Sequence, residues 1–346
     1  MASQTKLLRE PVLAPSSTLI LVTGASGHIG ANIVREALNL GYRVRGTART
    51  SSKCKTTVAE QHNHPNYSTA VVSDYSHPSD EIDAAVKGVD SIIHVASDTT
   101  FNDDADNVIG TVVAGTEHFL RAAAREPSVK RFTLTSSSTA AMLPKPGVEG
   151  IVLTADTWND EAVEAAKIKG TTVGPNVYPY VVYAASKTQS ERALWSFVEK
   201  EKPSFVVNAI LPDTNFGRVL GSAGATGGLA IGLFKEGVLP WPLSPQYFID
   251  VVDDARLHLC AAVLDQSLKN ERIFAYAYPF NISDCMETIK KVRPDVGASK
   301  LKPDPNEVRD LSKVPNELGA KLLKEWYGQD GYKTLEQSLK ENLEGI

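Results

Sequence analysis

The feature that most restricts the fold is an alternation of short apolar runs with helical patterns from the N-terminus to Pro212. Strands are predicted at "TLILVTGAS", "YRVRGTAR", "STAVVSDY", "SIIHVAS", "RFTLTSS" and "FVVNAILP". Helical patterns separate them, among them "HIGANIVREALNLG" and the stretch from Asp106 to Arg125. This alternation is typical of a parallel sheet with helices on both faces. The sequence therefore predicts an α/β fold built on a doubly wound parallel sheet.

Changes in composition divide the chain into three regions. Residues 1–17 are polar and are expected to form a flexible N-terminal arm, and residues 18–212 form the sheet domain. Within that domain, residues 140–179 are rich in Pro and Gly, which predicts an excursion over the sheet edge with a short acidic helix at "NDEAVEAAKIK". Residues 213–346 are less regular and predict a smaller C-terminal substrate lobe, partly interleaved with the sheet domain.

Composition excludes several classes of function. The 346 residues carry a formal net charge of −5, which argues against a nucleic-acid-binding surface. No apolar run is long enough to span a membrane, and the N-terminus lacks the apolar core of a signal peptide, so we expect a cytoplasmic protein. The three cysteines share no close spacing, which predicts neither a disulfide framework nor a metal site. We expect a monomer or a homodimer that acts on a small molecule.

A glycine-rich turn, "VTGASGHIG", connects the first predicted strand to the first predicted helix. Glycines at these positions let the backbone approach a pyrophosphate, and the N–H groups of the helix then face its negative charge. A purely structural tight turn is the alternative, but the strand before it and the helix after it favour a dinucleotide site of the Rossmann type. The cofactor-binding residues predicted in this turn are Gly24, Ser26, Gly27, His28, Ile29 and Gly30.

The end of the second predicted strand indicates which dinucleotide binds. An NAD site usually has a carboxylate there, whereas this chain reads "RGTARTSSK". Arg49 and Lys53 are placed to neutralise a 2′-phosphate, which favours NADP(H), although both could be solvated surface charges. Asp74, after the third strand, either accepts a hydrogen bond from the adenine amino group or is an ordinary polar strand end. Ala96, after the fourth strand, is also predicted to contact the cofactor.

The stretch "YVVYAASKTQSERALW" places Tyr183 and Lys187 one helical turn apart. An isolated phenol, with a pKa near 10, is a poor acid at neutral pH, and a neighbouring ammonium group would make it stronger. The fifth strand ends in "LTSSST", which brings a serine hydroxyl to the carboxyl edge of the sheet, where ligands bind in such folds. The combination predicts a serine, tyrosine and lysine site that acts on a carbonyl group.

These motifs together resemble the extended short-chain dehydrogenase/reductases. The strings "VKRFTLTSSSTAAMLPKP", "VYAASKTQSERALWSFVEKEKPSFVVNAILP" and "YFIDVVDDARLHL" are similar to fungal and yeast NADPH-dependent aldehyde and carbonyl reductases, relatives of dihydroflavonol reductases. The resemblance implies that Ser137 is catalytic, with Ser136 or Ser138 as the alternative. It also implies that Tyr183 is the general acid, that Lys187 binds the nicotinamide ribose, and that Pro212 lies beside the nicotinamide.

The substrate pocket is predicted between the strand ends and the C-terminal lobe. Its candidates are largely apolar, which favours a neutral aldehyde or ketone, although such residues more often build the core. A sugar-nucleotide epimerase or dehydratase is one alternative function, and a non-catalytic NADP-sensing regulator is another. The candidate substrate-binding residues are Phe101, Leu143, Pro175, Trp241, Gln246 and Tyr247.

Overall fold

The computed structural model describes residues 6–174, 176–239, 243–295 and 300–346. A seven-stranded parallel sheet in the order β3-β2-β1-β4-β5-β6-β9 forms the centre of the molecule. Its strands are β1 (Leu19–Val22), β2 (Arg43–Ala48), β3 (Tyr67–Val71), β4 (Ser91–His94), β5 (Arg131–Thr135), β6 (Val206–Pro212) and β9 (Arg272–Ala275). The predicted doubly wound α/β fold is confirmed, and all six predicted strands are present.

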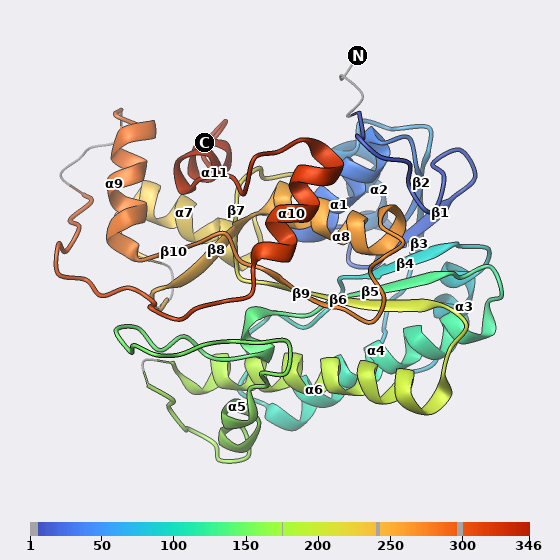
Figure 1. The fold of residues 1–346 in the computed structure, drawn as a ribbon, viewed down its shortest axis with the longest axis horizontal. Helices are drawn as coiled ribbons and strands as arrows, with labels where there is room; N and C mark the ends of the chain where they lie inside the picture. Colours follow the sequence, from blue (N-terminus) through green and yellow to red (C-terminus); the bar gives the residue numbers. More distant parts are fainter. Residues whose placement is uncertain (1–5, 175, 240–242, 296–299) are drawn as a thin grey trace.

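Helices cover both faces of this sheet, as Figure 1 shows for α4 and α6 on one side and α1, α8 and α10 on the other. The helices are α1 (His28–Asn39), α2 (Ser51–Glu60), α3 (Asp80–Val86), α4 (Ala105–Arg125), α5 (Asp160–Ala165), α6 (Tyr178–Glu201), α7 (Gly224–Glu236), α8 (Val251–Leu259), α9 (Ile282–Val292), α10 (Glu317–Tyr327) and α11 (Leu335–Asn342). A 3-10 turn covers Ser138–Ala140, and a π-helical turn, Cys260–Leu264, extends α8.

The strand sequences explain the two layers, because alternate side chains of a strand point to opposite faces. In β1, Ile20 and Val22 pack into the core beside α1 and α8, whereas Leu21 packs into the core beside α3, α4 and α6. In β4, Ile93 and Ile92 divide in the same way. A strand that is buried on both faces therefore needs apolar side chains at consecutive positions.

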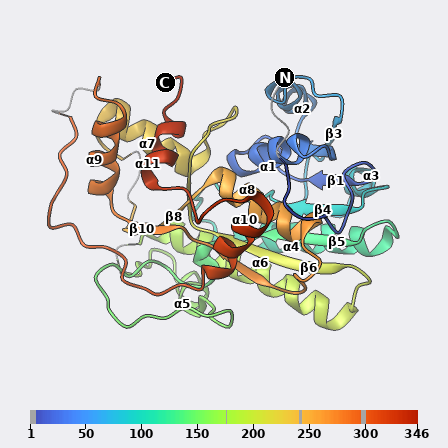
Figure 2. The same cartoon turned by 45° about the horizontal axis from the view of Figure 1, so that its top comes forward.

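The C-terminal part of the chain returns to the central sheet. β9 pairs with β6, while β7 (Thr214–Phe216), β8 (Gln246–Asp250) and β10 (Tyr278–Phe280) form a separate three-stranded sheet in the order β10-β8-β7. Helices α7, α9 and α11 gather beside this small sheet (Figure 2). Residues after Asp213 therefore contribute to both sheets.

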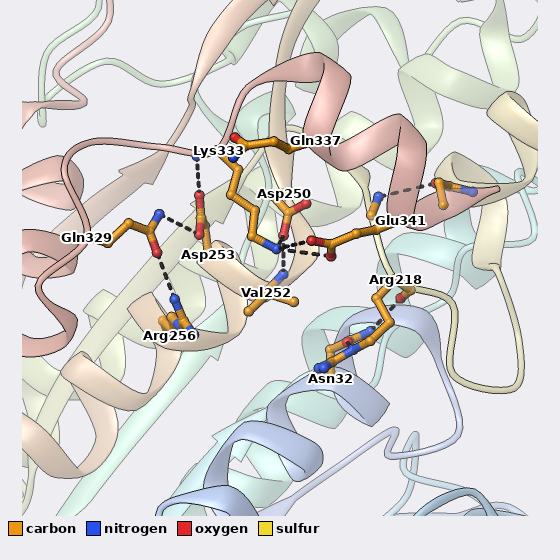
Figure 3. A network of polar contacts seen from close by, with 12 residues as sticks. Asn32, Arg218, Asp250, Val252, Asp253, Arg256, Gln329, Lys333, Gln337 and Glu341 are labelled. Carbon is orange, nitrogen blue, oxygen red and sulfur yellow. Dashed lines mark hydrogen bonds and ion pairs between the residues drawn. The ribbon is translucent and has the colours of Figure 1, made fainter. Parts of the chain in front are cut away.

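Polar contacts connect the end of the chain to α8, as Figure 3 shows. The Lys333 ammonium lies 3.2 Å from Asp250 Oδ1 and donates to Glu341 Oε1 at 2.8 Å, and its backbone N–H donates to Asp253 Oδ2 at 2.8 Å. Gln329 bridges Asp253 and the following turn of α8. These contacts fix residues 329–341 against the end of β8, a strand that borders the cavity described below.

Two peripheral segments are also anchored. In the predicted N-terminal arm, the N–H of Leu8 donates to Trp326 O and the N–H of Leu13 to Val263 O, so residues 6–17 lie along α10 and the π-helical turn. The excursion, residues 140–179, contains α5 as predicted. Its Gly147 N–H donates to Arg309 O at 2.8 Å, which connects it to the segment before α10.

Candidate active site

A large cavity opens at the carboxyl ends of β1, β4, β5 and β6, between the central sheet and the small sheet. Its volume is about 610 Å³, within the range of ligand sites. The predicted cofactor-binding residues all line it: Gly24, Ser26, Gly27, His28, Ile29, Gly30, Arg49, Lys53, Asp74, Ala96, Tyr183, Lys187 and Pro212. Ligands of open α/β sheets bind at this edge, so the cavity lies where the topology places a ligand site.

The glycine-rich turn has the geometry of a phosphate cradle. Gly24 has φ +64°, a conformation that favours glycine. A Cβ on Gly30 would lie 2.4 Å from the carbonyl oxygen of Gly24, so only glycine fits there. Gly27 caps α1, whose first N–H groups have no partner within the helix. The turn therefore presents backbone donors and the positive end of a helix to the cavity, which fits the pyrophosphate of a dinucleotide.

His28, also in this turn, is buried against the C-terminal lobe. Burial lowers the pKa of its imidazole to about 4, so the ring is neutral at pH 7. A Cβ on Gly224 would lie 3.1 Å from the Cβ of His28, and one on Gly227 would lie 3.4 Å from its Nε2. Two glycines of α7 thus let the lobe approach the turn closely.

The adenosine end of the cavity carries two exposed cations. Arg49 follows β2, and Lys53 lies in the first turn of α2, where the Thr50 side chain caps the helix by accepting from the Lys53 N–H at 3.2 Å. Neither side chain has a hydrogen bond or an ion pair with the rest of the described chain, so both are available to an anionic ligand. A 2′-phosphate would fit this pair.

Asp74 lies in the same region, three residues after the end of β3. Its Oδ1 accepts hydrogen bonds from the backbone and hydroxyl of Ser76 at 2.7 and 2.6 Å, and its Oδ2 lies 3.0 Å from His77 Nδ1. The bonds from Ser76 lower the pKa of the Asp74 carboxyl to about 2, with a further contribution from His77. The carboxylate stabilises its own loop and also lines the cavity, and its hydrogen bond to the adenine amino group stays a prediction.

The three consecutive serines after β5 point to different partners. Ser136 Oγ donates to Glu191 Oε2 at 2.6 Å, a carboxylate that does not line the cavity. Ser137 shares a hydrogen bond with the Tyr183 hydroxyl, and Ser138 shares one with Asp213. Ser137 also accepts from the Thr139 N–H at 3.2 Å, which fixes its rotamer at the start of the 3-10 turn. Among the three serines, Ser137 is the one hydrogen-bonded to the tyrosine.

Tyr183 and Lys187 extend from α6 toward these serines. Burial raises the pKa of the Tyr183 hydroxyl, and the bond to Ser137 partly offsets this shift. Burial also lowers the pKa of the Lys187 ammonium to about 8, against the effect of Glu191 one turn further along α6. Lys187 Nζ donates to Thr135 O at 2.9 Å and to Ser97 Oγ at 3.3 Å. An ammonium group has three donors, so one remains for a bound ribose.

The predicted substrate-binding residues divide into three groups. Phe101 and Gln246 line the cavity, and the Phe101 ring lies 5.2 Å from the Tyr183 ring. Leu143 does not line it, because its side chain packs between α5 and α6 in a separate apolar cluster. Tyr247 is also buried, and it donates to Ser312 O at 2.7 Å. Pro175 and Trp241 lie outside the described residues.

The comparisons with known proteins identify the family. Residues 20–274 match the NAD dependent epimerase/dehydratase family. This chain belongs to that family. It is 37% identical to aldehyde reductase 2 of Sporidiobolus salmonicolor, over 94% of this chain and 95% of the relative. It is also 37% identical to the NAD-dependent epimerase/dehydratase terH of Aspergillus terreus, over 96% and 98%.

A solved structure agrees with the fold. The yeast methylglyoxal/isovaleraldehyde reductase Gre2, in complex with NADPH, matches with a TM-score of 0.79 and 23% identity, over 94% of this chain and 97% of that chain. The resemblance to the extended short-chain dehydrogenase/reductases, noted from the sequence, is thereby confirmed.

Two residues that contribute to the site, Thr23 and Asp213, were not predicted from the sequence. Thr23 Oγ1 accepts from the N–H groups of Val95 and Ala96, at 2.9 and 3.0 Å, and lies 3.0 Å from His94 Nδ1. It thereby fixes the strand ends under the glycine turn. Asp213 follows Pro212 directly and lines the cavity beside Ser138. Its position after the proline was visible in the sequence, but nothing in the sequence indicated its surroundings.

The described residues hold no group of three or more His, Cys, Asp or Glu side chains arranged to bind a metal ion. Over the same residues, no helix has the length and apolar character needed to cross a membrane.

Proposed function

We propose that this protein reduces the carbonyl group of a neutral aldehyde or ketone to an alcohol with NADPH. The observation that carries the proposal is the Ser137–Tyr183 hydrogen bond, in a cavity shared with Lys187 and the glycine turn. A relative that is 37% identical over 94% of the chain is named aldehyde reductase 2, and a structural neighbour named as a reductase binds NADPH, which supports the same activity.

The residues of this chain divide the work as follows. Bound NADPH would supply the hydride. Ser137 and Tyr183 polarise the substrate oxygen by hydrogen bonding, and Tyr183 delivers its proton to that oxygen. Because burial raises its pKa, the Tyr183 hydroxyl keeps its proton at neutral pH until charge develops on the substrate oxygen. The buried Lys187 ammonium holds the ribose and places a positive charge at the site.

The charges of the cavity favour a neutral substrate. Among the described residues, the cations that line it are Arg49, Lys53 and Lys187. The first two lie at the adenosine end, and Lys187 lies beside Tyr183 on α6. No further cation remains for the diphosphate of a sugar nucleotide, which argues against the epimerase alternative. The same constellation of Ser137, Tyr183 and Lys187 would serve no purpose in a non-catalytic sensor.

The direct test is NADPH oxidation by the purified protein with a panel of aldehydes, ketoesters and aryl ketones, repeated with NADH. We expect turnover of several neutral carbonyl compounds with NADPH. Turnover only of sugar nucleotides, or tightly bound NAD in the purified protein, would instead support the epimerase.

Cofactor choice is tested by replacing Arg49 and Lys53 with alanine together. We expect the KM for NADPH to rise about 10- to 100-fold, as expected for the loss of hydrogen bonds to a charged group, with little change in the KM for NADH. Steady-state kinetics with both cofactors measures this difference. Replacing Lys55, an exposed residue on α2 that does not line the cavity, provides the control. An equal rise in KM for NADPH and for NADH would contradict the assignment of Arg49 and Lys53 to the 2′-phosphate.

A further inference from the structure

A backbone carbonyl at the end of β5 orients the Lys187 ammonium group. Lys187 Nζ donates to Thr135 O at 2.9 Å, and Thr135 is the last residue of that strand. The pairing of β4 with β5 ends one residue earlier, where His94 lies opposite Leu134. The Thr135 carbonyl therefore lies beyond the part of β5 that pairs with β4, and its position also depends on the other contacts of Thr135.

The Thr135 side chain is held from the opposite face of the sheet. Its hydroxyl Oγ1 lies 2.8 Å from Nε2 of His258, which is near the C-terminal end of α8. Figure 1 shows α8 on one face of the central sheet and α6, the helix that carries Lys187, on the other. His258 and Lys187 therefore meet at one residue, Thr135, from the two sides of the sheet.

The His258 ring is fully buried and is held at both nitrogens. Its Nδ1 donates to Asp254 O at 2.8 Å and lies 3.2 Å from Asp254 Oδ1, one turn earlier on α8. A carbonyl oxygen only accepts, so Nδ1 carries a proton and the orientation of the ring is fixed. A threonine hydroxyl can donate or accept, so it pairs with Nε2 in the neutral ring and in the imidazolium alike.

The helix that carries His258 is itself anchored. Asp250 caps α8 by accepting from the Val252 N–H at 2.9 Å. Lys333 contacts Asp250 through its ammonium group and Asp253 through its backbone N–H, as Figure 3 shows. None of these contacts involves α6. The Thr135 hydroxyl is therefore held by an element that is fixed separately from the helix of Lys187.

We propose that His258 is a positioning residue, which holds Thr135 so that the Thr135 carbonyl aims the Lys187 ammonium group at the nicotinamide ribose. The proposal rests on the proposed function, in which Lys187 binds that ribose, and it adds a residue that does not line the cavity. Thr135 O and Ser97 Oγ use two of the three ammonium donors. A shift of the carbonyl would therefore redirect the third donor as well.

The test removes the Thr135 hydroxyl and nearly preserves the size of the side chain. Thr135→Val should raise the dissociation constant for NADPH about 10-fold and lower kcat by a similar factor, because the ammonium group loses its orientation. Thr135→Ser keeps the hydroxyl and should bind NADPH as the wild type does. Titration of NADPH fluorescence measures this binding without any turnover.

Thr133→Val is the matched control. Thr133 lies two residues earlier on β5, so its side chain points to the same face of the sheet as that of Thr135. Its hydroxyl is buried, has no hydrogen-bond partner in the described part of the chain and does not line the cavity. Thr133→Val should bind and oxidise NADPH as the wild type does. An equal loss in both valine variants would overturn the proposal.

The pH profile of kcat/KM for NADPH separates positioning from stability. A carbonyl that accepts from an ammonium group favours its charged form, so Thr135→Val should move the basic limb, near the Lys187 pKa of about 8, to lower pH. Tyr183 and Glu191 flank Lys187 on α6, and burial together with the Lys187 charge lowers the pKa of His94 on β4 to about 3. These groups are unchanged in the variant. A lower unfolding midpoint with the wild-type profile and affinity would show a structural role alone and overturn the proposal.

Two substitutions of His258 test the same contact from α8. His258→Gln places its terminal amide near the position of Nε2, which keeps a partner for Thr135, so NADPH should bind as in the wild type. His258→Asn is one methylene shorter and keeps a polar group only near the position of Nδ1, so it should behave as Thr135→Val does. If Thr135→Val does not fold, this pair decides, and equal NADPH affinity in the two His258 variants would contradict the positioning role.

The outcomes distinguish this proposal from the proposed function. If the wild type binds NADPH but reduces no carbonyl compound, the proposed function fails, whereas the NADPH titrations still decide the role of His258. If the wild type reduces carbonyl compounds and Thr135→Val changes neither the NADPH affinity nor the pH profile, the positioning role alone is wrong.

Discussion

Replacing Tyr183 with phenylalanine should lower kcat by about 10³-fold, in the range expected for loss of a general acid. The change removes one hydroxyl, the group hydrogen-bonded to Ser137, and keeps the ring that lies 5.2 Å from Phe101. The aromatic packing of α6 at the cavity is therefore preserved. We expect the dissociation constant for NADPH to change by a few-fold at most. Single-turnover kinetics, together with a titration of NADPH binding, measures both effects.

Tyr178→Phe provides the matched control on the same helix. The Tyr178 hydroxyl donates to Ala166 O at 2.8 Å within the protein and does not line the cavity. Its removal should cost about 1 kcal/mol of stability and leave kcat unchanged. If Tyr183→Phe kept more than a few per cent of wild-type turnover with normal NADPH binding, the proposed general acid would be wrong.

The strands and the glycine turn could be predicted because their signals are local. The apolar run of β4 and the Gly24 to Gly30 spacing each reflect a constraint that operates within a few residues. β9 could not be predicted in the same way. Its four residues, Arg272–Ala275, carry little pattern, and they complete the sheet by pairing with β6 about sixty residues earlier in the chain.

The direction in which a side chain points also could not be predicted from the sequence. Ser136, Ser137 and Ser138 are chemically identical, and their different partners depend on how β5 leads into a 3-10 turn. Leu143 was predicted to contact substrate as an apolar residue of the excursion. It packs instead between α5 and α6, in an apolar cluster of its own with Ala162, Val181 and their neighbours.

Protonation behaviour depends on burial, which a single sequence does not reveal. Lys187 was expected to acidify Tyr183, yet the dominant effect on the pKa of that hydroxyl is burial, which raises it. The same effect raises the pKa of the Asp213 carboxyl to about 8. Both shifts arise where separate elements meet, since Tyr183 lies on α6 and Asp213 lies between β6 and β7.

A buried ion pair between Arg272 of β9 and Glu191 of α6 lies close to the active site. The Glu191 side chain is inaccessible to solvent, and it accepts from Arg272 Nε at 2.6 Å, Ser136 Oγ at 2.6 Å and Trp195 Nε1 at 3.1 Å. The Arg272 guanidinium lies 4.0 Å from the Trp158 ring centre and also donates to backbone carbonyls of the excursion. Arg272 thereby joins β9, α6 and the excursion.

Replacing Arg272 with methionine should destabilise the protein by about 3–5 kcal/mol, because Glu191 would remain buried without a countercharge. The midpoint of urea or thermal unfolding measures the loss. Arg121→Met serves as the control, since Arg121 pairs with Glu117 at 3.7 Å on the surface, and it should change stability by less than about 1 kcal/mol.

A second substitution separates unpaired charge from lost packing. Combining Arg272→Met with Glu191→Gln removes the orphaned charge, so the double variant should be more stable than Arg272→Met alone. A double variant as unstable as the single one would show that the stacking on Trp158 and the bonds to the excursion, rather than the ion pair, account for the loss.

Because Glu191 also raises the pKa of Lys187, Glu191→Gln should in addition shift the basic limb of the pH–rate profile to lower pH.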